Sequence, residues 1–188
     1  MASTNRSSFT TAAQRGVQLF EFSSSHVLDS VVFSERTRRF EVSSSHRQHT
    51  TTIRCFNPER TVCTIDWGTR IVDIPDGSIP KQRISECVPL DRRRKTRKLS
   101  FGGVEYTWIT KKGGFSLYNK KTNQDMANIW TLPGHPPRVE IYCHSVHAGL
   151  LDSCVIAAVL FLSKRNLDID EDHGNVRLGT YLLLPPTH

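Results

Sequence analysis

The sequence predicts a mainly β fold, a closed antiparallel barrel built around one hydrophobic helix near the C-terminus. The run Leu150–Leu162 is apolar except at Asp152 and Ser153. The region before it reads as a succession of short strands separated by turns rich in glycine and proline. A sheet of many short strands tends to curl, and closure removes its exposed edges. Because the interior of a large barrel must be filled, a helix that is apolar on all sides fits there.

The helix is expected over residues 148–164. At 1.5 Å per residue the apolar run is about 20 Å long, which is shorter than the ~30 Å hydrocarbon core of a bilayer. Asp152 would lie near the positive end of the helix dipole, and Lys164 and Arg165 in the last turn near its negative end. The length favours burial in protein, and a short membrane anchor with basic flanks is the alternative.

Several strands and turns can be placed along the chain. Residues 61–67 alternate, with Cys63, Ile65 and Trp67 on one face and Val62 on the other. Two adjacent glycines at 102–103 predict a tight hairpin, because glycine accepts the positive φ of a primed turn. Other turns are expected at 111–114, 119–123 and 133–137, and other strands at Val17–Phe22, 38–42, Thr50–Phe56, 138–142 and 176–184. Residues 75–98 read as a long exposed connection.

Two segments of the N-terminal half resemble each other at a spacing of twenty residues. FEFSSSH covers residues 20–26 and FEVSSSH covers residues 40–46. A single echo is not a repeat architecture, which needs several units. Each copy is interpreted as a strand that runs into a serine-rich turn.

Composition divides the chain into three parts. Residues 1–16 are polar and are expected to form a disordered tail, with a transit peptide as the alternative. Residues 17–165 form the barrel domain, and residues 166–188 are a C-terminal extension. The chain has five cysteines and neither a CxxC pair nor an N-terminal apolar signal segment, which favours free thiols and an intracellular, cytoplasmic location.

One block of positive charge is the best candidate for a binding site. Its members supply all but one of the seven net positive charges of the chain, and they are Arg92, Arg93, Arg94, Lys95, Arg97 and Lys98. On an exposed loop they would meet an anionic lipid headgroup or an acidic protein. Lysines 111, 112, 120 and 121 would extend this surface if their two turns lie beside it. A solvated loop without a ligand and a nuclear-import signal are the alternatives. Because the rest of the chain is nearly neutral, no nucleic acid partner is expected.

No catalytic, metal or cofactor site is predicted. Cys143, His144, His147 and Asp152 cluster in sequence, but without a signature of nucleophilic catalysis or zinc binding. Aspartates 168, 170 and 172 have the spacing of the first calcium-loop ligands. The glycine and the glutamate that such a loop needs at positions six and twelve are replaced by a histidine and a glycine.

The order of several short motifs resembles a fungal family of uncharacterised domains with a tubby C-terminal-like barrel. The motifs are LSFGGVEYTW at 99–108, FSLY at 115–118, MANI at 126–129 and LLD at 150–152, with TTTIR at 50–54 and TIDW at 64–67 upstream. That family resembles the group that includes plant LURP-one-related proteins and phospholipid scramblases. The resemblance implies a barrel of about twelve strands around a hydrophobic helix, and phosphoinositide binding through surface lysines and arginines. Scramblase-like members carry an acidic calcium segment before the helix, whereas here the acidic turn follows it.

These features together predict a non-enzymatic binding module for anionic lipid headgroups or protein partners, located in the cytoplasm or peripherally at membranes. A membrane-attached, scramblase-like protein with an inserted helix is one alternative. An enzyme that uses Cys143 and a structural or stress-related scaffold without a small ligand are the others.

Overall fold

The computed structural model describes residues 16–75, 79–93, 95–101, 104–119, 124–142 and 149–168. Within these ranges the chain forms thirteen strands and two helices. The strands are β1 (Val17–Phe22), β2 (Ser30–Ser34), β3 (Thr37–Ser45), β4 (Thr50–Phe56), β5 (Glu59–Asp66), β6 (Ile71–Ile74), β7 (Ile79–Arg83), β8 (Leu90–Asp91), β9 (Thr96–Phe101), β10 (Val104–Lys111), β11 (Gly114–Asn119), β12 (Gln124–Trp130) and β13 (Arg138–Tyr142). The helices are α2 (Ile84–Cys87) and α3 (Leu150–Leu162).

All thirteen strands belong to one antiparallel sheet. Its order is β7-β6-β5-β4-β3-β2-β1-β13-β12-β11-β10-β9-β8, so almost every strand pairs with its sequence neighbours. The exception is the pairing of β1 with β13, which joins the two halves of the chain. The predicted mainly β, antiparallel fold with a C-terminal helix is therefore confirmed.

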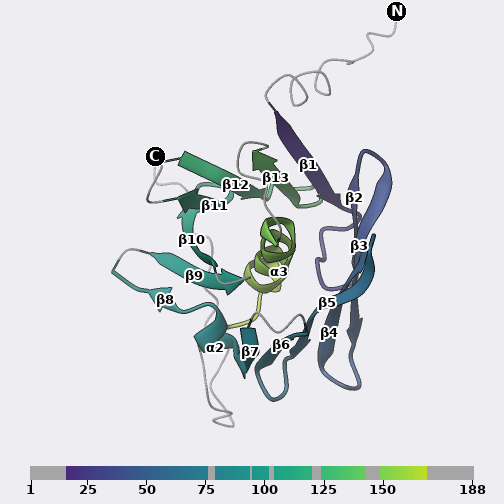
Figure 1. Cartoon of the computed structure of the whole chain (residues 1–188), viewed down its shortest axis with the longest axis vertical. Coiled ribbons are helices and arrows are strands. Elements are labelled where there is room, and N and C mark those ends of the chain that lie inside the picture. The colour runs from purple at the N-terminus through teal and green to yellow at the C-terminus, as the bar shows by residue number, and fades with distance from the viewer. Residues whose placement is uncertain are drawn as a thin grey trace, which may run out of the picture.

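The sheet curls around α3, and the short helix α2 stands between its two edge strands (Figure 1). Those edge strands, β7 and β8, form no ladder with each other in the described residues. Closure of the sheet by hydrogen bonds, which the prediction of a closed barrel implies, is therefore not confirmed.

The core is formed by alternate residues of the strands. In β4 the buried residues are Thr51, Ile53 and Cys55, which lie between exposed or partly exposed neighbours. Cys63 and Ile65 of β5 are also buried, as predicted, and Trp67 is buried just beyond that strand. This alternation is the reason why these segments read as strands from the sequence.

Val62 was expected on the face of β5 opposite to Cys63, but it is buried as well. The cause is an irregularity in the β4–β5 ladder. Ile53 pairs with Cys63 and the next residue, Arg54, pairs with Thr61, which leaves Val62 without a partner in the register. An extra residue of this kind is a β-bulge, which breaks the strict alternation of faces.

Two predicted hairpins are confirmed by the register. Phe101 pairs with Val104, so two residues join β9 to β10. Lys111 pairs with Gly114, so two residues also join β10 to β11, and Gly113 between them has a φ of 82°. A positive φ is the reason why this turn uses glycine.

The helix α3 begins and ends inside the predicted range 148–164. Residues 152–160 are all buried, among them Val155, Ile156 and Val159. Asp152 lies in the first turn, as expected, and pairs with Arg60 of β5. Among the described residues, no helix has both the length and the apolar character needed to cross a membrane.

The expectation that Lys164 and Arg165 close the last turn of the helix is wrong. The helix ends at Leu162, and Lys164 adopts a left-handed conformation with a φ of 60°. The Ser163 hydroxyl donates to the Leu160 carbonyl and accepts the backbone N–H of Arg165 at 3.2 Å. These bonds turn the chain out of the helix one residue before the basic pair.

The interpretation of residues 75–98 as a long exposed connection is also wrong. This region contains β7, α2, β8 and the start of β9, and Ile84, Cys87 and Val88 are buried. The backbone N–H of Ile84 donates to the Arg70 carbonyl at 2.8 Å, which anchors α2 to the turn before β6.

Packing continues beyond residue 165, since Leu167 is buried in the core. Of the predicted tail at 1–16, residues 1–15 lie outside the described residues, and so does the predicted strand at 176–184.

Candidate functional site

The predicted basic block divides into a turn and a strand. Arg92, Arg93 and Lys95 lie exposed in the turn between β8 and β9, whereas Arg97 and Lys98 lie within β9. Lys95 has a left-handed backbone with a φ of 53°. Arg94 lies outside the described residues.

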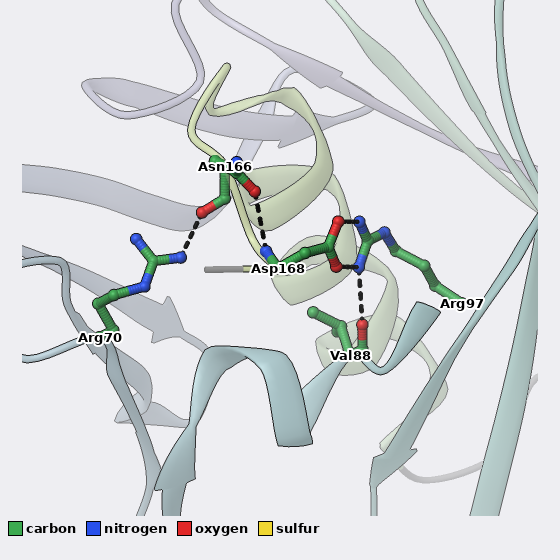
Figure 2. A network of polar contacts seen from close by, with 5 residues as sticks. All are labelled: Arg70, Val88, Arg97, Asn166 and Asp168. Atoms are coloured by element: carbon green, nitrogen blue, oxygen red, sulfur yellow. Dashed lines mark hydrogen bonds and ion pairs between the residues drawn. The ribbon is translucent and has the colours of Figure 1, made fainter. Parts of the chain in front are cut away.

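The side chain of Arg97 contacts other segments of the protein instead of solvent, and Figure 2 shows these contacts. Its guanidinium forms two parallel bonds to the Asp168 carboxylate, at 2.9 and 2.8 Å, and donates to the Val88 carbonyl at 2.9 Å. Arg70, from the turn between β5 and β6, donates to the backbone carbonyl of Asn166. The segment after α3 is thus tied to β9 on one side and to the β5–β6 turn on the other.

This network bridges the two ends of the open sheet, since β6 neighbours the edge strand β7 and β9 neighbours the edge strand β8. Arg97 is therefore a structural cation. Its partner Asp168 is the first residue of the acidic turn whose aspartates have the spacing of the first calcium-loop ligands. Positions 170 and 172 of that turn lie outside the described residues.

Lys98 also has an acidic partner. Its ammonium lies 3.0 Å from a carboxylate oxygen of Glu105 on the neighbouring strand β10. Successive residues of a strand point to opposite faces, so Arg97 and Lys98 cannot act on one ligand from one side. Because Lys98 is paired although its side chain is exposed, the exposed residues of the block without an acidic partner in the described part of the chain are those of the turn, Arg92, Arg93 and Lys95.

One lysine of the predicted lysine-rich turns is paired with an acidic side chain. Lys111 lies 2.9 Å from Asp125. Burial tends to raise the pKa of the Asp125 carboxyl, but hydrogen bonds from Lys111 and Ser116 outweigh burial and hold that pKa below its usual range. Lys112 is exposed, and positions 120 and 121 lie outside the described residues.

The described residues contain no group of three histidine, cysteine or acidic side chains placed to hold a metal ion. Cys143, His144 and His147, which were considered for catalysis or zinc binding, lie outside the described residues. The other cysteines, Cys55, Cys63, Cys87 and Cys154, are buried free thiols.

Sequence reasoning missed a hollow of about 220 Å³ at the C-terminal end of α3. We call it the α3-end pocket. Segments from four places in the chain line it. They are the serine-rich turn after β1, the end of β3 with the turn that joins it to β4, Trp67, and the residues that end α3. The prediction that the second echo segment also runs into a serine-rich turn is wrong, because its three serines are the last residues of β3. The lining residues are Ser25, His26, Val27, Leu28, Asp29, Ser44, Ser45, His46, His49, Thr50, Thr51, Trp67, Leu162, Ser163, Lys164 and Arg165.

The two echo segments meet in this pocket because of the strand order. β1 and β3 both pair antiparallel with β2, so they run in the same direction and end at the same end of the sheet. His26 and His46, the last residues of the two copies, consequently line one pocket. Their similarity was the one signal in the sequence that pointed to this site.

Hydrogen bonds join the segment between β1 and β2 to the end of β3. The backbone N–H of Ser44 donates to the Asp29 carboxylate at 2.9 Å, and the Ser44 hydroxyl donates to the Leu28 carbonyl. The Thr51 hydroxyl accepts the indole N–H of Trp67 at 2.8 Å. The walls are therefore fixed by contacts that leave the histidine rings exposed to solvent.

No protein-family model and no curated protein matches the chain. Among solved structures, the X-ray structure of a protein from Arabidopsis thaliana aligns with it over 78% of this chain and 93% of that chain. The TM-score is 0.44 and the sequence identity is 8%. This distant likeness assigns neither a family nor an activity to the chain.

Proposed function

We propose that this protein is a non-enzymatic binding module for anionic lipid headgroups, and that the turn between β8 and β9 makes the contact. The observation that carries the proposal is the exposure of Arg92, Arg93 and Lys95 together on one turn. Within the described residues, none of their side chains forms an ion pair with an acidic group of the fold. Their charge is available to a partner.

An apolar residue adjoins this turn. Leu90 keeps 36% of its surface exposed, which makes it one of the few large apolar side chains of the described residues that reach solvent. Cations beside an exposed leucine suit a membrane surface, where each lysine or arginine contributes about 1 kcal/mol. An apolar side chain adds contact with the acyl boundary.

The resemblance to tubby-like, LURP-one-related and scramblase-like proteins belongs to the same proposal, as does a barrel closed across α2. A curled antiparallel sheet around a buried C-terminal helix supports this kinship, and so does the order of the short motifs along the chain. The function does not depend on it, because binding sites are grafted onto folds.

Liposome flotation tests the lipid contact. The full chain is mixed with phosphatidylcholine vesicles, with or without a phosphoinositide, and the floated fraction is measured. The variant Arg92→Ala/Lys95→Asn removes two charges from the turn. Asparagine tolerates the left-handed backbone at position 95 and so keeps the turn intact.

The matched control is Arg38→Ala/Arg36→Asn, which removes the same charge from the exposed β2–β3 region, where Arg36 is also left-handed with a φ of 67°. We expect flotation that requires the anionic lipid, with about a thirtyfold loss of vesicle affinity in the turn variant, which lacks two charges, and little change in the control. Equal, negligible flotation on both vesicle types, or the same loss in both variants, would overturn the proposal.

A further inference from the structure

We infer that the α3-end pocket is a binding site for a phosphate monoester, separate from the lipid-binding turn. The group would enter the hollow between the turns that follow β1 and β3 and meet the basic residues that follow α3. Binding is non-covalent and does not depend on the function proposed for the turn.

Charge is the first argument. The lining contains Lys164, Arg165 and three histidines, His26, His46 and His49, all exposed to solvent. Asp29 is the only acidic residue of the lining, and its carboxylate already accepts the Ser44 backbone N–H. The pocket therefore carries positive charge even when its histidines are neutral.

The C-terminus of α3 reduces the positive charge of the pocket but does not make it negative. A helix C-terminus corresponds to a partial charge of about −0.5, which disfavours an anion. Lys164 and Arg165 bring two full positive charges to the same end. A ligand with two negative charges is favoured over a neutral one because the balance stays positive.

Arg165 is held in place before any ligand arrives. Its guanidinium lies 4.7 Å from the ring centre of Trp67, and Thr51 fixes that indole through its N–H. The backbone of Arg165 donates to the Ser163 hydroxyl. A guanidinium that stacks by its face leaves its N–H edge free for two acceptor oxygens, the arrangement that phosphate recognition uses.

The donors also differ in kind and direction. Imidazole N–H groups come from the turns after β1 and β3, and the cations come from the other wall. A phosphate monoester presents three acceptor oxygens pointing in different directions, so it can bond to both walls at once. A carboxylate has two oxygens in one plane and would leave one wall unused.

Apolar residues limit what the phosphate is attached to. Val27, Leu28 and Leu162 line the same hollow, and its volume of 220 Å³ is below the usual range for drug-sized ligands. The structure therefore fits a small organic phosphate, or the headgroup of a lipid whose chains stay outside.

Titration calorimetry on the full chain at constant ionic strength tests the inference. The probes are inorganic phosphate, phenyl phosphate and, as a neutral analogue, benzyl alcohol. We expect phenyl phosphate to bind most tightly, inorganic phosphate more weakly and benzyl alcohol not at all. Vesicles that contain phosphatidic acid, which also presents a phosphate monoester, distinguish a lipid source from a soluble one.

The test variant is Lys164→Asn and its control is Arg36→Asn, in the turn between β2 and β3. Both residues are exposed and left-handed, with φ values of 60° and 67°, and asparagine tolerates that backbone, so both variants keep the fold. We expect about a tenfold or greater loss of phenyl phosphate affinity for Lys164→Asn and no change for Arg36→Asn, because hydrogen bonds to charged groups are strong.

A second variant, Arg165→Gln, should weaken phenyl phosphate binding to a similar extent. Absence of saturable phosphate binding, or equal losses for Lys164→Asn and Arg36→Asn, would overturn the inference. Failure of this site leaves the lipid-binding turn untouched, since the flotation variant changes no residue of the pocket.

Discussion

At the scale of single residues, Gly114 is fixed by a close approach of two backbones. A Cβ atom at this position would lie 1.8 Å from the carbonyl oxygen of Ile129, on the paired strand β12. Backbone atoms of a central ladder cannot move aside without breaking hydrogen bonds. We therefore predict that Gly114→Ala lowers the free energy of unfolding by about 3 kcal/mol or more, at the upper end of the range for overpacking.

Urea unfolding followed by circular dichroism measures this loss, and Gly134→Ala is the control. Gly134 has a φ of 76° but no atom within 4 Å of a Cβ, so its substitution strains only the backbone. That cost is about 1 kcal/mol. Equal effects of the two substitutions would contradict the steric account of Gly114.

The ion pair of Arg97 and Asp168 is the second prediction at this scale. The side chains are 17% and 33% exposed, and the contact is bidentate. Such a pair should be stronger than an exposed one, for which the coupling energy is typically below about 1 kcal/mol. We predict a coupling energy of about 1–2 kcal/mol in a double-mutant cycle of Arg97→Gln and Asp168→Asn.

The ion pair Lys98–Glu105 joins β9 to β10, and its side chains are 44% and 54% exposed. A second double-mutant cycle on this exposed pair serves as the reference. The free energies of unfolding of the four variants in each cycle are measured in urea. If the Arg97–Asp168 coupling is no larger than that of the reference pair, the segment after α3 does not fasten the ends of the sheet.

At the scale of elements, α3 is buried along its length between residues 152 and 160. Ala157 and Ala158 have no exposed surface, so a larger side chain at either position must be accommodated inside the core. We predict that Ala157→Leu destabilises the protein by about 1–3 kcal/mol, the usual cost of overpacking a core. The free energy of unfolding measures it.

The same substitution discriminates between protein and lipid as the surroundings of α3. A helix surrounded by lipid gains apolar surface from leucine and is not destabilised. An unchanged or increased stability of Ala157→Leu, together with retention in the membrane pellet after alkaline carbonate extraction, would contradict burial in the sheet.

The elements that could be predicted from the sequence are those specified locally. β4 and β5 alternate, the β9–β10 and β10–β11 hairpins have glycines at their turns, and α3 is continuously apolar. The short elements β6, β7, α2 and β8 have two to five residues each. Each of these strands pairs with a sequence neighbour, but so few residues cannot show a clear alternation of buried and exposed positions. The helix α2 is held by the Arg70 carbonyl, which receives its first N–H, and a contact of this kind has no pattern in the sequence.

The candidate sites show the same limit. The exposed turn at Arg92, Arg93 and Lys95 follows from the composition of one short segment. The engagement of Arg97 does not, because its partner Asp168 lies 71 residues away. The α3-end pocket requires the order of β1, β2 and β3 and the position of the helix end. The echo that ends at His26 and His46 therefore predicts two strands from the sequence alone, but not that their ends line one pocket.

At the scale of the whole molecule, three buried thiols make the free energy of unfolding depend on pH in the alkaline range. Burial raises the pKa of Cys87 from 9.0 to about 12, with a hydrogen bond from Gln82 opposing the shift. Burial raises the pKa of Cys154 further still. For Cys63, burial and then the neighbouring Cys87 and Asp73 raise the pKa well above 9.0. All three groups therefore hold their protons in the folded state at pH values where the unfolded chain releases them.

The sign of the effect follows from this difference. Below pH 9 both states carry the three protons, and the stabilisation is complete. Above pH 9 the unfolded state binds fewer protons than the folded state, so the free energy of unfolding decreases as the pH rises. Between pH 8 and pH 10 each thiol should remove about 1.4 kcal/mol of stability, and the three together about 4 kcal/mol.

Urea unfolding under reducing conditions at pH 8 and pH 10 measures this loss for the unmodified chain and for Cys87→Ala. The substitution lowers stability at both pH values by creating a small cavity, but it removes one of the titrating groups. We therefore expect the difference between pH 8 and pH 10 to shrink by about 1.4 kcal/mol in the variant. If both proteins lose the same stability between these pH values, Cys87 titrates alike in the folded and the unfolded state. Burial in the core then does not raise the pKa of its thiol.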